Sequence, residues 1–70
     1  MRNPARIYRI VNLFARLWQM QPDSRFFQLI EWVNEMAKES FKKDDLFFVE
    51  DDDLKIFLDN LIKQQENKKQ

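Results

Sequence analysis

Residues 17–30, L-W-Q-M-Q-P-D-S-R-F-F-Q-L-I, place a proline between two apolar stretches that have helical spacing. Pro22 has no backbone N–H and disfavours helical geometry in the residue before it, so a helix that contains Trp18 should end shortly afterwards. The carboxylate of Asp23 can accept from the free N–H groups of a new first turn, and Ser24 is a second candidate for this role. The stretch therefore predicts two helices joined at a corner, onto which the rest of the chain packs.

The first predicted helix begins at Asn3 and Pro4, an N-cap and a residue suited to the first helical position, and ends near Met20. Apolar side chains at helical spacing predict one buried stripe, formed by Ile7, Ile10, Val11, Phe14, Leu17 and Trp18. Four arginines lie together on the neighbouring flank with Leu13 and Met20: Arg2, Arg6, Arg9 and Arg16. A solvated basic edge is the simpler interpretation of this flank, and a surface for nucleic acid or a protein partner is the alternative.

The second predicted helix runs from about Ser24 to about Glu39, and its wide apolar sector indicates a central position among the helices. A charged loop follows. Residues 46–49, L-F-F-V, favour β structure but have no partner strand in the chain, so we predict an extended segment laid across the helices. Pairing of this segment with its copy in a second molecule is the alternative.

Residues 50–53, E-D-D-D, precede the third predicted helix, where negative charge suits the positive end of the helix dipole. A divalent-metal site is the less favoured interpretation, because the alternating ligands and the glycine of an EF-hand loop are missing. Ile56 lies opposite the Leu54, Leu58 and Leu61 face, so we expect it to be exposed. The polar, lysine-rich residues 64–70 predict a disordered tail.

These elements predict an all-α fold, a compact three-helix domain over residues 1–63 with a short extended segment at about 46–49 before the third helix. We expect Trp18 and Phe26 at the corner to share a core with Phe57 and Leu61. Seventy residues are few for a stable core.

The absence of Cys, His and Gly excludes several kinds of chemistry. Disulfides, the commonest general base and the glycine-rich phosphate loops all need one of these residues. Together with the lack of a catalytic motif, this leads us to expect no enzymatic activity, cofactor or metal. Since no apolar run reaches the roughly 18–20 residues of a membrane span, and no signal peptide is evident, we expect no membrane association and a cytoplasmic location.

Formal charge is zero overall but unevenly distributed along the chain. Residues 1–20 carry four arginines and no acid, whereas residues 44–59 carry seven acids and one lysine. The basic first helix and the acidic third segment can face one another within the domain, or they can orient the molecule against a charged partner.

Apolar residues in excess of a small core indicate a non-enzymatic module that docks on another protein. The candidate contact residues are Phe27, Trp32, Phe47, Phe48 and Ile56. The alternative function, which we consider less favoured, is nucleic-acid binding through Arg2, Arg6, Arg9 and Arg16. The same excess predicts a homodimer that uses Trp32 or residues 46–49, with a lid of Phe47 and Phe48 folded back on the monomer as the competing prediction.

Several residues also resemble a family signature, W-x-x-x-P-D-x-R-x-x-Q-L-I, formed here by Trp18, Pro22, Asp23, Arg25, Gln28, Leu29 and Ile30. It resembles a group of short uncharacterised proteins of bacteria and their phages, in which an acidic helix start similar to residues 48–54 follows. The YihD family of small bacterial proteins is more distantly similar. The resemblance implies a compact helical fold and a phage or prophage setting, and it implies no activity.

Overall fold

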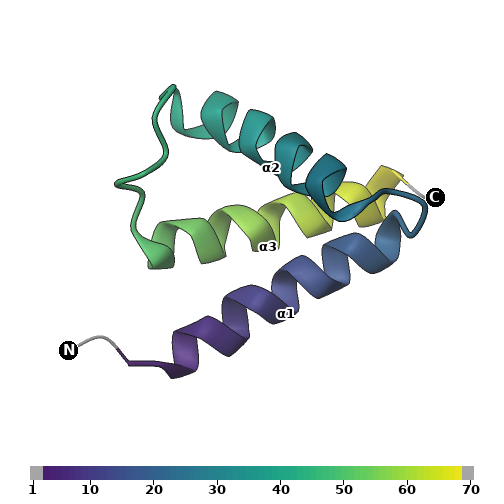
Figure 1. The fold of residues 1–70 in the computed structure, drawn as a ribbon, viewed down its shortest axis with the longest axis horizontal. Helices are drawn as coiled ribbons and strands as arrows, with labels where there is room; N and C mark the ends of the chain where they lie inside the picture. Colours follow the sequence, from purple (N-terminus) through teal and green to yellow (C-terminus); the bar gives the residue numbers. More distant parts are fainter. Residues whose placement is uncertain (1–2, 69–70) are drawn as a thin grey trace.

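The computed structural model describes residues 3–68, which form three helices and no strand: α1 (Ala5–Met20), α2 (Phe26–Phe41) and α3 (Asp51–Lys68). This confirms the predicted all-α, three-helix fold. Figure 1 shows α1 and α2 meeting at one end of the molecule and α3 running back between them, so that α1 and α3 point in the same direction. The connection from α2 to α3 and the beginning of α1 lie at the opposite end.

The helix starts follow from local hydrogen bonds. Asn3 Oδ1 accepts the Ala5 N–H at 3.0 Å, which satisfies one of the free donors at the start of α1. At the corner, the Gln21 N–H donates to the Trp18 carbonyl at 2.9 Å and ends α1 close to the predicted position. The Gln28 side chain then accepts the Arg25 N–H at 2.9 Å. The helix α2 therefore begins at Phe26, later than predicted, with Arg25 rather than Asp23 or Ser24 as its N-cap.

The buried core is built from all three helices. Its members are Leu13 and Leu17 of α1, Leu29, Val33 and Ala37 of α2, and Phe57, Leu58, Leu61 and Ile62 of α3. Burying a large apolar side chain of this kind contributes roughly 1.5–3 kcal/mol to stability. Among the helix pairs, α1 and α3 have the most extensive close backbone contact.

The buried face of α1 differs from the predicted stripe. Leu13, which the sequence placed on the arginine flank, is buried, whereas Ile7 and Val11 of the predicted stripe are half exposed. Trp18 and Phe26, predicted to share a core with Phe57 and Leu61, keep 37% and 49% of their surface exposed. On this side α1 buries Leu13 and Leu17 in the core that it shares with α2 and α3, and Arg6 and Arg16 of the same flank pair with carboxylates of α3.

The connection between α2 and α3 begins at Lys42, which has left-handed backbone angles (φ 57°, ψ 44°) and ends α2. Residues 46–49 close a turn through a 3.1 Å hydrogen bond from the Val49 N–H to the Leu46 carbonyl, where the sequence predicted an extended run. The side chains at the two ends of this turn are half-buried, and Leu46 packs against the core. The turn thus fastens the connection to the helices at both of its ends.

The helix α3 continues to Lys68, so residues 64–68 are helical where the sequence predicted a disordered tail. The residues in this stretch are Gln, Glu, Asn and Lys, and most of these have good helix propensity. In addition, Glu66 forms an ion pair with Arg16 of α1 at 2.9 Å. Residues 69 and 70 lie outside the described part of the chain.

Candidate interaction surfaces

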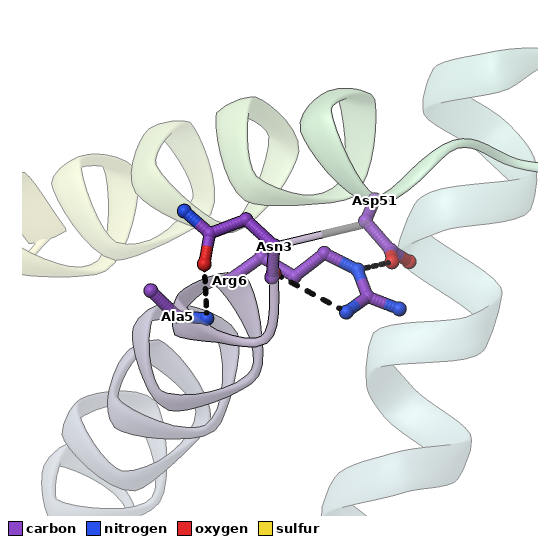
Figure 2. A network of polar contacts seen from close by, with 4 residues as sticks. All are labelled: Asn3, Ala5, Arg6 and Asp51. Atoms are coloured by element: carbon purple, nitrogen blue, oxygen red, sulfur yellow. Dashed lines mark hydrogen bonds and ion pairs between the residues drawn. The ribbon is translucent and has the colours of Figure 1, made fainter. Parts of the chain in front are cut away.

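A network of polar contacts joins the first turns of α1 and α3 (Figure 2). Arg6 Nε donates to Asp51 Oδ2 at 2.7 Å, and Arg6 Nη1 donates to the Asn3 carbonyl at 3.5 Å. The Arg6 and Asp51 side chains are each about one-third exposed. The arginine therefore links the N-terminal segment of α1 to the acidic start of α3.

The predicted arginine flank is the side of α1 that faces α3. At the far end of the two helices, Arg16 Nη2 donates to Glu66 Oε1 at 2.9 Å. Arg9 is exposed and forms no ion pair with another residue in the 3–68 range, and Arg2 lies outside that range. The expectation that the basic first helix faces the acidic third segment is thus met within the domain.

The ion pairs of the arginine flank with α3 affect the alternative prediction, that the flank binds nucleic acid. Affinity for phosphate backbones depends on the number of cations that are available to neutralise phosphates. Among the described arginines of the flank, Arg6 and Arg16 already pair with carboxylates of α3, which leaves Arg9. The geometry therefore gives this alternative little support.

Three aromatic rings lie in a row at the corner between α1 and α2. The Trp18 and Phe26 ring centroids are 5.6 Å apart, and those of Phe26 and Phe27 are 5.3 Å apart in an edge-to-face arrangement. The Trp18 indole N–H donates to the Ser24 carbonyl at 2.8 Å, which fixes the indole on the corner. Phe27, one of the predicted contact residues, keeps 80% of its surface exposed. We call this row the corner cluster.

The sequence assigned two members of the corner cluster to the core, because Trp18 and Phe26 have the spacing of buried residues. Both lie at helix ends, next to the Pro22 turn. A side chain at the end of a helix is not covered by the neighbouring helix. In the sequence, the only sign that Trp18 and Phe26 are exposed is their position close to the predicted helix ends.

Two further predicted contact residues lie apart from the corner cluster. Trp32 is half-buried and packs against the core from α2. Ile56 is largely exposed on the outer face of α3, as predicted, and none of the other candidate residues lies on that helix.

Phe47 and Phe48, the remaining predicted contact residues, occupy the two central positions of the turn over residues 46–49. They are 83% and 78% exposed, and their ring centroids are 5.0 Å apart, edge to face. The Asp45 carboxylate accepts the Phe47 N–H at 2.9 Å and fixes the start of the turn. The rings are therefore directed away from the domain, and the predicted lid that folds back on the monomer is absent from this arrangement. We call these two residues the aromatic turn.

An apolar pocket of about 290 Å³ lies beside the aromatic turn. It is lined by side chains from all three helices and by both ends of the turn, among them Phe14, Val33, Phe41, Leu46, Val49 and Leu54. The Phe41 ring, which packs against Phe57 with centroids 5.6 Å apart, forms part of its wall. The pocket and the exposed rings of the turn are thus immediate neighbours.

Comparisons with protein-family models, with curated proteins and with solved structures give no match for this chain. The resemblance to the phage and bacterial signature and to the YihD family stays a prediction.

The described residues were also searched for a metal-binding cluster and for a membrane-spanning helix. Within residues 3–68, no group of three or more Asp and Glu side chains is arranged so that it could hold a metal ion, and the acidic residues 51–53 form the first turn of α3. No helix in the same range is both long enough and apolar enough to cross a membrane.

Proposed function

We propose that this protein is a non-enzymatic docking module that binds another protein through the corner cluster. The observation that carries the proposal is the row formed by Trp18, Phe26 and Phe27, which is exposed and held in place by the Trp18–Ser24 hydrogen bond. Tryptophan and other aromatic residues dominate binding energies at protein interfaces. A row fixed before binding also loses little conformational entropy when a partner covers it.

The shape of the corner favours a partner with an apolar recess. Phe27 projects from the outer side of the first turn of α2 and is the most exposed ring of the row. Trp18 lies beside a shallow hollow whose other walls are Ala15, Gln19 and Pro22. A partner that receives Phe27 would therefore also contact the α1 side of the corner.

The proposal can be tested by affinity capture from a lysate of the cells that produce this chain, followed by binding measurements with the captured protein. Phe27→Ala should weaken binding roughly tenfold or more, as is expected for an anchoring aromatic residue. Tyr8→Ala is the matched control, because Tyr8 is an exposed aromatic residue of α1 near the other end of the molecule. Equal losses in the two variants, or no captured protein at moderate salt, would contradict the proposal.

A further inference from the structure

One apolar face of α1 is left largely exposed within residues 3–68. Its members recur at intervals of four, three and four residues: Ile7, Val11, Phe14 and Trp18. Phe14 is half-buried, whereas Ile7 and Val11 keep 50% and 57% of their surface exposed. At 3.6 residues per turn, this row lies roughly 100° around the helix from Leu13 and Leu17. The helix therefore has two apolar faces, and only the Leu13–Leu17 face is buried in the core.

The edge of α2 that faces this row has the same kind of spacing. Its members recur at intervals of three, four, three and four residues: Phe27, Ile30, Asn34, Ala37 and Phe41. Such spacing is typical of helices that pack along another helix. Phe14 of the first row and Asn34, Ala37 and Phe41 of the second line the apolar pocket beside the aromatic turn. The two rows are therefore the walls of one groove, which we call the α1–α2 groove.

The α1–α2 groove runs from the corner cluster to the aromatic turn. Trp18 and Phe27 lie at its corner end, and Leu46 and Val49 line it at the other end. Figure 1 shows α1 and α2 meeting at the corner and lying apart at the opposite end, with α3 between them. Leu54 of α3 belongs to the lining of the pocket. The three helices thus occupy three positions of a four-helix bundle, and the fourth position lies over the groove.

The exposed apolar surface along the groove is large for so small a domain. Besides Ile7 and Val11, the three rings of the corner cluster keep between 37% and 80% of their surface exposed. Since a large aromatic side chain has about 150–250 Å² to bury, these five side chains expose roughly 500 Å². A partner that covered them and their polar surroundings would bury roughly 800 Å² of this protein, the usual share of a specific interface.

The chemistry of the groove favours a helix as its occupant. Residues 3–68 contain no strand, so a partner strand would find no sheet edge to pair with. Neither row contains an arginine or a lysine, so the groove is unsuited to a phosphate backbone. At the turn end, residues 42–53 contain six acids and two lysines, and Arg6 pairs with Asp51. This end remains acidic and complements a basic segment of a partner.

We propose that the α1–α2 groove receives an amphipathic helix of a partner protein, which completes a four-helix bundle. The apolar side of the partner helix packs between the two rows, and its end at the aromatic turn is basic. The proposal rests on the proposed function, because the corner cluster forms one end of the groove. It adds the kind of segment that the partner supplies.

A synthetic peptide tests the groove in the absence of the natural partner. The probe has leucine at the a and d positions of about three heptads, lysines at one end and glutamine elsewhere. It should bind the full chain and change the NMR amide shifts of α1 and α2 residues along the groove, with little change around Ile56 on the outer face of α3. A peptide of the same composition in scrambled order should not bind. Replacing the lysines by glutamates should weaken binding about threefold or more.

A pair of variants on α1 locates the binding face. Val11→Asn should raise the Kd of the probe about tenfold, because it buries an unpaired amide in the middle of the apolar row. Tyr8→Asn is the matched control, since Tyr8 is 73% exposed on the same helix but lies about 90° around it from the row. It should leave the Kd unchanged. Circular dichroism should show the helices retained in both variants, because both side chains are exposed.

Three results with the peptides would overturn the proposal: no binding of the probe, equal binding of the scrambled peptide, or equal Kd values for the two variants. Sedimentation of the chain alone gives a fourth. A dimer that Val11→Asn dissociates would make a second copy the occupant of the groove. Each of these results can occur while the captured protein still depends on Phe27. Failure of the groove is therefore distinguishable from failure of the proposed function, which the Phe27→Ala measurement decides.

Discussion

Arg6 and Asp51 are 45 residues apart in the chain, yet Arg6 Nε donates to Asp51 Oδ2 at 2.7 Å. Together with the Arg16–Glu66 pair, this contact links the parallel helices α1 and α3 at both ends, since one pair lies near their N-terminal ends and the other near their C-terminal ends. The arginine flank is therefore part of the interface between the two helices.

We expect the Arg6–Asp51 pair to contribute modestly to stability. Each side chain is about one-third exposed, so water and salt screen their attraction. A double-mutant cycle with Arg6→Ala and Asp51→Asn, measured by chemical denaturation, should give a coupling energy below about 1 kcal/mol that falls as salt is added. A coupling of several kcal/mol that is insensitive to salt would contradict this.

The core of α3 should be far more sensitive to substitution. Phe57 is buried and contacts the Phe41 ring, so Phe57→Ala should lower the free energy of unfolding by about 3–5 kcal/mol. Ile56, the preceding residue, is largely exposed, and Ile56→Ala should change it by about 0.5 kcal/mol or less. Thermal melts of the two variants make the comparison. Equal melting temperatures would show that α3 is rotated from its position in this structure.

Lys42→Gly should stabilise the protein. Lys42 has a left-handed backbone conformation at the end of α2, which is unfavourable for a residue with a Cβ atom and is adopted readily by glycine. After allowance for the greater flexibility of glycine in the unfolded chain, the gain should be about 0.5–1 kcal/mol. Denaturant midpoints give the measurement, and Lys43→Gly, one residue further on, is the control that should not stabilise.

Trp18→Phe tests the hydrogen bond that orders the corner cluster. The substitution keeps an aromatic ring beside Phe26 but removes the indole N–H that donates to the Ser24 carbonyl. The loss should be about 1 kcal/mol, the usual net contribution of a hydrogen bond, when measured by denaturation. Amide hydrogen exchange should also become faster at residues 21–25. Unchanged exchange would indicate that the corner is held by packing alone.

The existence of the three helices could be predicted from the sequence, and so could the start of α1, its end beside Pro22 and the start of α3. The end of α3 could not, because residues 64–68 are helical. Asn3, Pro22 and the acids at residues 50–53 act locally, on the backbone groups next to them, so their effects do not depend on the rest of the fold. The exposure of Phe27, Phe47 and Phe48 also followed from an excess of apolar residues over the space in a small core. The exposure of Ile56 followed from its position on the face of α3 opposite Leu54, Leu58 and Leu61. The same excess argument fails for Trp32, which packs against the core.

The face that α1 buries could not be predicted in the same way. Both the Ile7–Val11 side and the Leu13–Leu17 side are apolar enough to be buried, and the choice depends on which helix lies alongside. In the folded protein Leu13 and Leu17 join the core beside α3, and arginines of the same flank pair with carboxylates of that helix. Contacts between residues 45 or more positions apart leave no periodic signal in a single sequence.

The close approach of α1 to α3, rather than to α2, has a consequence for the order of folding. On a growing chain, α1 and α2 are synthesised before the α3 residues that complete their core, and until then the Leu13–Leu17 face of α1 has no close partner. Joining α1 to α3 also requires closure of the whole intervening loop, whose entropy opposes early pairing. The nascent chain should therefore stay unfolded until Leu58 and Leu61 have left the ribosome, and then fold in a single cooperative step.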